Sequence, residues 1–184
     1  MAADCSTTEV SMIEEILQRF ASDLSMITDR DLSVQQGEVR REAQRPVGRG
    51  QIHIAFRMAI AGQAETRYGC LLLPLPEAVS LAGYLMMLPD EDVHERRERE
   101  TLDEATRDAI LEVGGFLAGA MDAALRESTG LEFRVSLDGC QGVRRNVRPA
   151  LAYREGDPLL VGRARASVHD FPEFELILML PELG

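Results

Sequence analysis

The sequence predicts a single α+β domain in which long helices pack on one face of an antiparallel sheet. Three observations support this fold class. Apolar residues recur at three- and four-residue spacing over residues 10–24 and 102–127, as in amphipathic helices. They alternate with polar residues over 50–62, as in a half-buried antiparallel strand. No segment within residues 1–184 has the composition of a flexible linker, so we expect one domain.

The first helix has a continuous apolar face. Ser6 with Glu9, and Ser11 with Glu14, each fit a capping box, so either serine can begin the helix. We expect residues 1–9 to form a disordered N-terminus. The apolar face consists of Val10, Ile13, Ile16, Leu17, Phe20, Ala21 and Leu24.

The remaining elements follow from alternation, prolines and glycines. Residues 70–88 are apolar apart from Glu77, but Pro74 and Pro76 divide them into a buried strand and a helix over 77–88, which argues against a membrane span. The predicted strands are 33–43, 50–62, 65–73, 132–139, 158–170 and 174–180.

Two further segments complete the chain. The charge-dense residues 89–100 are expected to form a surface loop or a frayed helical turn. Thr101 and Glu104 form another capping box, which opens the long helix, and Gly130 is placed to end it.

Composition excludes several classes of function. The net charge of −11 argues against nucleic acid as the main partner, and the arginines of 144–148 are interpreted as a solvated loop that pairs with nearby acids. There is no lysine, which excludes lysine nucleophiles and P-loops. Three widely spaced cysteines and the absence of a signal peptide indicate the cytoplasm. Isolated histidines predict no metal site, and no cofactor motif occurs.

The polar side of the long helix contains two glycines. Asp108, Glu112, Gly115, Gly119 and Asp122 follow one another at spacings of four, three, four and three residues, so they share one face. A glycine inside a helix costs about 0.8–1 kcal/mol relative to alanine. Two explanations remain open: the glycines permit close packing within the protein, or another surface approaches this face closely.

The first helix resembles the long one. Residues 15–24 align with 112–121 without a gap, so that Glu15 matches Glu112 and Gln18 matches Gly115. The alignment indicates either an internal duplication with a pseudo-twofold axis or the ordinary similarity of two amphipathic helices.

The segment LDEATRDAILEVGGFLAGAMDAAL (102–125), with LLLPLPEAVSLAGYLM (71–86) before it, resembles the CheC/CheX family of chemotaxis phosphatases, and CheX more than CheC. The resemblance covers about residues 10–180. It implies a CheX-like α+β domain that binds a CheY-like receiver domain and hydrolyses its aspartyl phosphate. It also implies a homodimer formed through sheet edges. No cofactor is implied.

The family's functional positions are only partly kept. Glu112 occupies the position of the family's glutamate, which pairs with a receiver lysine, and Asp108 that of the acid one turn earlier. Gly115 stands where the family has the asparagine that orients the attacking water. The resemblance therefore implies docking through Asp108, Glu112, Gly115, Gly119 and Asp122 with weak or degenerate phosphatase activity.

Two alternatives remain. An active phosphatase would use Glu15 and Gln18, or Glu112 with the water held in another way. The second alternative is a structural or assembly module related to flagellar-switch proteins, which share the family's fold. Such a module would neither prefer the phosphorylated receiver nor release phosphate from it.

Overall fold

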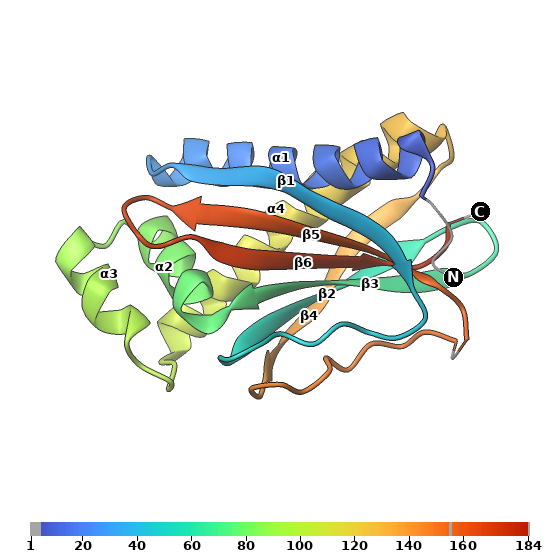
Figure 1. Ribbon diagram of the computed structural model, residues 1–184. Coiled ribbons are helices and arrows are strands. Elements are labelled where there is room, and N and C mark those ends of the chain that lie inside the picture. The colour runs from blue at the N-terminus through green and yellow to red at the C-terminus, as the bar shows by residue number, and fades with distance from the viewer. Residues whose placement is uncertain (1–4, 155, 184) are drawn as a thin grey trace.

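A six-stranded antiparallel sheet carries helices on one face in the computed structural model, which describes residues 5–154 and 156–183 (Figure 1). The elements are α1 (Thr7–Thr28), β1 (Leu32–Glu42), β2 (His53–Ala61), β3 (Thr66–Pro74), α2 (Leu75–Leu85), α3 (Asp90–Arg97), α4 (Glu104–Thr129), β4 (Arg134–Val143), β5 (Leu159–Val168) and β6 (Phe174–Leu180). The predicted fold class and the six predicted strands are confirmed.

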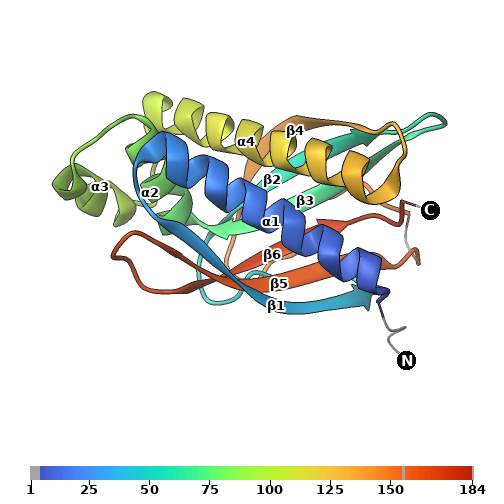
Figure 2. The ribbon, with the colours of Figure 1, turned by 90° about the horizontal axis from the view of Figure 1, so that it is seen from above.

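The sheet has internal symmetry in its strand order, which is β1-β5-β6-β3-β2-β4. The chain passes twice through a helix followed by three strands, first α1-β1-β2-β3 and later α4-β4-β5-β6, with α2 and α3 in between. If β1, β2 and β3 are exchanged with β4, β5 and β6, the strand order becomes β4-β2-β3-β6-β5-β1. This is the observed order read from the other edge of the sheet. Figure 2 shows α1 and α4 side by side and antiparallel. The topology therefore favours an internal duplication over the chance similarity of two helices.

The start of α1 differs from the expectation. The backbone N–H of Ser6 donates to Glu9 Oε2 at 2.8 Å, and the N–H of Glu9 donates to Ser6 Oγ at 3.2 Å. This capping box begins the helix at Thr7, so residues 7–9 are helical and not disordered. Residues 1–4 of that prediction lie outside the described part of the chain.

The prediction of a loop over 89–100 is wrong, because α3 occupies most of it. Val93 is fully buried and packs on Gly83 of α2, where an added Cβ would lie 2.9 Å from a Val93 methyl group. One turn later, Arg97 Nη2 lies 2.9 Å from Glu77 Oε1 of α2. These tertiary contacts hold a helix that has a single buried apolar residue.

The core lies on both faces of the sheet. Helices α1, α2 and α4 cover one face, and Ile13 of α1 approaches so closely that a Cβ on Gly162 of β5 would lie 2.4 Å from it. Residues 43–52, 144–154 and 156–158 cross the other face, where Leu151 is buried against the strands. No helix of the described residues is long and apolar enough to cross a membrane.

Two of the three arginines of 144–148 are engaged within the fold. Arg145 forms an ion pair with Glu100, and the Arg148 Nε–H donates to the carbonyl oxygen of Arg45 at 3.0 Å. The interpretation of a loop that pairs with nearby acids therefore holds for Arg145, whereas Arg148 joins the two covering segments to each other.

Candidate functional site

Helix α4 ends at Gly130 as the sequence predicts, but the predicted start is wrong, because the capping residue is Asp103 and not Thr101. Asp103 is the N-cap, and its Oδ1 accepts the backbone N–H of Thr106 at 2.8 Å. Gly130 ends the helix in the left-handed conformation, with φ of 65°, and its N–H bonds to the carbonyl oxygen of Arg126. The helix thus runs uninterrupted through all three of its glycines.

The three glycines have different surroundings. A Cβ on Gly114 would lie 2.8 Å from both terminal methyl groups of Leu137 on β4 and 3.0 Å from the Phe56 ring on β2. Close packing within the protein therefore accounts for Gly114. A Cβ on Gly115 or Gly119 would meet nothing within 4 Å, so the fold does not require glycine at either position.

The acids on the same face divide into two groups. Asp108 and Glu112 are exposed, and among the described residues no hydrogen bond or ion pair engages either carboxylate. Asp122 is different: its Oδ1 accepts the backbone N–H of Val135 at 3.0 Å, and its other oxygen pairs with Arg126. Asp122 therefore fastens α4 to the beginning of edge strand β4, and only the first half of the face offers unpaired carboxylates.

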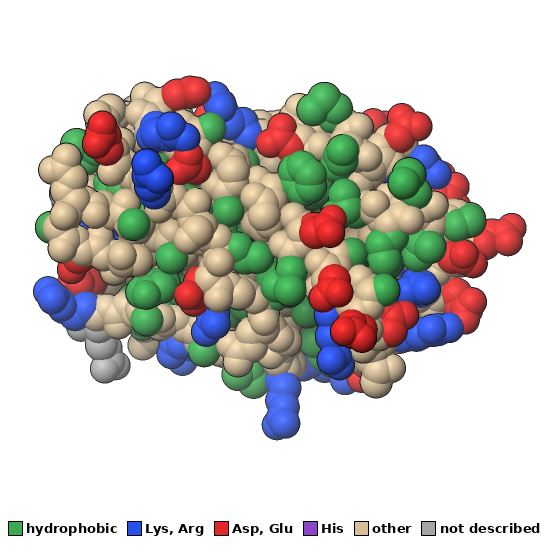
Figure 3. Space-filling view, turned by 180° about the vertical axis from the view of Figure 1, so that it is seen from behind, with side chains coloured by type: hydrophobic (Ala, Val, Ile, Leu, Met, Phe, Trp, Pro, Cys, Tyr) green, Lys and Arg blue, Asp and Glu red, His purple; other side chains and the backbone are tan. Residues whose placement is uncertain are grey.

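An open groove continues the face at its C-terminal end. It has a volume of about 690 Å³ and lies between α4 and the beginning of β4, with Gly119, Asp122, Arg126 and Phe133 among its lining residues. Because Gly119 has no side chain, nothing at that position separates the groove from the exposed face of α4. Figure 3 shows this side of the molecule, with acidic side chains scattered among apolar ones.

The two candidate residues on α1 are committed to the fold. Glu15 pairs with Arg19, which also reaches Glu127 at the end of α4. The Gln18 side-chain amide donates to the carbonyl oxygen of Val34 on β1 at 2.9 Å. Gln18 thus points toward the sheet edge, and the structure does not bring it together with Glu112.

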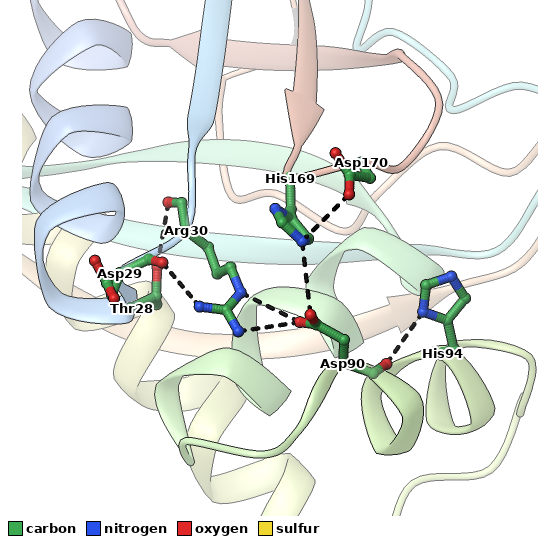
Figure 4. Close-up of polar contacts among 7 residues, drawn as sticks. All are labelled: Thr28, Asp29, Arg30, Asp90, His94, His169 and Asp170. Atoms are coloured by element: carbon green, nitrogen blue, oxygen red, sulfur yellow. Dashed lines mark hydrogen bonds and ion pairs between the residues drawn. The ribbon is translucent and has the colours of Figure 1, made fainter.

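A polar cluster that the sequence does not predict lies where α1, α3 and the turn between β5 and β6 meet (Figure 4). Arg30 donates to Asp90 Oδ1 from Nη2 at 3.1 Å, and His169 Nε2 lies 3.8 Å from Asp90 Oδ2. The hydrogen bond from Arg30 lowers the pKa of the Asp90 carboxyl below its ordinary value. His94 Nδ1 lies 3.1 Å from the Asp90 carbonyl oxygen.

The cluster has no sequence signal because Arg30, Asp90 and His169 are 60 or more positions apart in the chain. Its contacts join the end of α1 to the start of α3. The described contacts therefore indicate a structural role, which is to hold these two elements together. No group of three His, Cys, Asp or Glu side chains in the described part of the chain is arranged to bind a metal ion.

No protein-family model matches the chain, and no curated protein matches its sequence. Solved structures do match its fold. Thermotoga maritima FliY superposes with a TM-score of 0.72 at 19% sequence identity, over 97% of this chain and 92% of that one. The FliM middle domain from H. pylori gives a TM-score of 0.68 at 8% identity, over 96% of this chain and 94% of that one.

A chemotaxis protein CheX from Desulfovibrio desulfuricans gives a TM-score of 0.60 at 13% identity, over 92% of this chain and 99% of that one. The chain therefore has the fold that CheX shares with FliY and the FliM middle domain. At these identities the similarity concerns the fold alone.

Proposed function

We propose that this protein docks a response-regulator receiver domain, preferentially in its phosphorylated form, through the exposed face of α4, and that its phosphatase activity is weak or lost. The observation that carries the proposal is the state of that face. Gly115 and Gly119 are exposed with open space above them, and Asp108 and Glu112 beside them have no ion pair or hydrogen bond with any residue that the structure describes.

A face of this kind suits close docking. Without side chains at Gly115 and Gly119, a partner can approach the helix backbone, and Glu112 remains free to pair with a basic side chain of that partner. In the family that the helix resembles, the glutamate pairs with a receiver lysine. The unpaired state of Glu112 supports the same role here.

Hydrolysis needs more than docking. Phosphoryl transfer depends on positioning the attacking water, which the family's asparagine amide does. Gly115 has no side-chain amide, and backbone groups within a helix already bond to each other. The alternative site on α1 is disfavoured, because Gln18 is bonded to Val34 and Glu15 to Arg19. We therefore expect binding with little turnover.

One observation favours a second function, that of an assembly module. FliY and the FliM middle domain superpose with TM-scores of 0.72 and 0.68, against 0.60 for CheX. The H. pylori FliM domain has been solved in complexes with FliG and with SpeE. A module of that kind would bind its partner whether or not a receiver were phosphorylated.

The test compares a receiver of the same organism with and without beryllofluoride, a mimic of the aspartyl phosphate, by calorimetry. Phosphate release is measured in parallel for wild type, Gly115→Asn and Glu112→Ala. Preference for the beryllofluoride form, loss of binding in Glu112→Ala and new turnover in Gly115→Asn support the proposal. Equal binding of both forms supports the assembly module, and turnover by wild type supports the active phosphatase.

A homodimer is also proposed, through the free edges of β1 or β4, since the outer side of each pairs with no other strand among the described residues. Light scattering at micromolar concentration tests it, and a monomer mass would contradict it.

A further inference from the structure

Four large apolar side chains stand exposed around the first half of α4. The exposed fraction is 79% for Met26 and 55% for Ile27, at the end of α1, and 89% for Met87, in the connector between α2 and α3. Leu111 of α4 itself is 43% exposed. Isolated exposed apolar residues are ordinary, but a group at one place marks an interaction surface.

The contacts of Arg30 place the turn after α1 beside the end of α2 and the start of α3. Arg30 follows Ile27 by three residues, and its guanidinium bonds to Asp90 at 3.1 Å and lies 5.0 Å from the centre of the Tyr84 ring. Met87 lies midway between Tyr84 and Asp90 in the chain. The end of α1 is therefore held against the connector that carries Met87 (Figure 4).

The same end of α1 lies along the first half of α4. The two helices are antiparallel, and the middle of α1 pairs with the end of α4 through Arg19 and Glu127 (Figure 2). The last turn of α1 therefore lies beside α4 on the N-terminal side of Glu127. In the space-filling view from behind, apolar and acidic side chains are interspersed over this half of the molecule (Figure 3).

Met87 occupies a position at the end of α2 where glycine is the favoured residue. The N–H of Leu88 bonds to the carbonyl oxygen of Gly83 and that of Met87 to Tyr84, as in a Schellman motif that ends α2. This motif places Met87 in the left-handed conformation, with φ of 57°, where glycine is the favoured residue. The Met87 side chain is almost fully exposed, so its burial does not explain why a methionine occupies this strained position.

We infer that Met26, Ile27 and Met87 form an apolar anchor patch that binds the same partner as the α4 face, and that this partner presents apolar side chains flanked by arginine or lysine. The charges argue for this chemistry. Asp23 on α1 and Asp29 at its C-cap, like Asp108 and Glu112 on α4, have carboxylates with no ion pair in the described structure, whereas the neighbouring Arg30 is occupied by Asp90. Methionine side chains adapt their shape to a partner at little cost. The inference rests on the proposed docking function.

The test measures binding of the beryllofluoride-activated receiver by calorimetry at two salt concentrations. We expect Met26→Gln/Ile27→Gln, which keeps helix-forming side chains, to weaken binding roughly tenfold without changing the salt dependence. Asp108→Asn/Glu112→Gln should weaken binding and reduce its salt dependence. Val147→Gln is the control, because Val147 is also an exposed apolar residue (47% exposed) but lies on a covering segment of the sheet's other face; this variant should bind as wild type does.

Met87→Gly separates binding from folding. Glycine relieves the left-handed strain, so the midpoint of thermal unfolding should rise while binding weakens several-fold. If Gly119→Arg abolishes binding but the methionine and isoleucine variants bind as wild type does, the patch inference is overturned and the proposed docking stands. If the wild-type protein binds neither form of the receiver, both are overturned.

Discussion

The side-chain amide of Gln18 is bonded to the carbonyl oxygen of Val34 at 2.9 Å. This contact distinguishes two helices that look alike in sequence. On α1 the amide that could hold a water is turned toward strand β1, and on α4 the matching position is Gly115. Neither helix presents both a free glutamate and a free amide, which is the physical reason to expect docking without efficient hydrolysis.

The first prediction concerns Gln18→Ala. The substitution removes one exposed hydrogen bond, so the free energy of unfolding should fall by about 0.5–1 kcal/mol in urea titration. Receiver binding and phosphate release should not change. A specific loss of phosphate release would transfer the chemistry to α1 and contradict the assignment of the docking face.

The second prediction compares the glycines of α4. Gly115→Ala and Gly119→Ala should each raise the free energy of unfolding by about 0.8–1 kcal/mol, because alanine favours the helix and its Cβ meets open space. Gly114→Ala should lower it by about 1 kcal/mol or more, because Leu137 and Phe56 would have to move. Denaturant titrations of the three variants are the measurement. Equal effects at Gly114 and Gly115 would contradict the placement of the two faces.

The third prediction concerns the ion pair that holds α3. Arg97 bonds to Glu77 and to Ser80 Oγ at 3.0 Å and lies 3.7 Å above the centre of the Phe171 ring. Its side chain is 10% exposed and that of Glu77 is 7% exposed. Because Arg97→Ala leaves a buried carboxylate without its partner, it should cost about 3–5 kcal/mol in free energy of unfolding.

The matched control is Arg99→Ala, which breaks the exposed pair with Glu95 two residues further along the chain. It should change the free energy of unfolding by about 0.5 kcal/mol or less. If the two arginine variants are equally stable, the contact between α2 and α3 does not hold the helix.

The fourth prediction concerns pH. Hydrogen bonds from Thr106, and then the charge of Arg96, lower the pKa of the Asp103 carboxyl below its ordinary value of 3.8. A lowered pKa in the folded state stabilises the protein at pH above the ordinary value, and this stabilisation is lost as the pH falls through the folded pKa. Asp103→Asn keeps a capping group that does not titrate.

The measurement is the midpoint of thermal unfolding for wild type and Asp103→Asn between pH 6 and pH 2.5. The advantage of wild type over the variant should be constant above about pH 5 and should shrink as the pH falls below 4. A constant difference over the whole range would mean that Asp103 does not titrate differently in the folded and unfolded states.

Much of the fold could be predicted because its signals are local. The alternation over 50–62 and the spacing of apolar residues over 102–127 predict β2 and α4 directly, since side chains in a strand or helix repeat at fixed intervals. Helix α3 was missed because its sequence contains one buried apolar residue, Val93, and its stability comes from α2. A local sequence pattern cannot indicate a stabilising contact with a residue in another helix or strand.

The sequence by itself determined which residues share the exposed face of α4, because helical periodicity places Asp108, Glu112, Gly115 and Gly119 together. Only the tertiary structure decided which of these residues pack against other elements and which of them have partners. It packed Gly114 against Leu137, left Gly115 open and tied Asp122 to β4, whereas Asp108 and Glu112 have no partner in the part of the chain that the structure describes. It also turned Gln18 toward Val34 and gathered Met26, Ile27 and Met87 at one end of the helices. The physical reason is that periodicity sets the direction of a side chain, whereas its contacts depend on chain segments that folding brings from elsewhere.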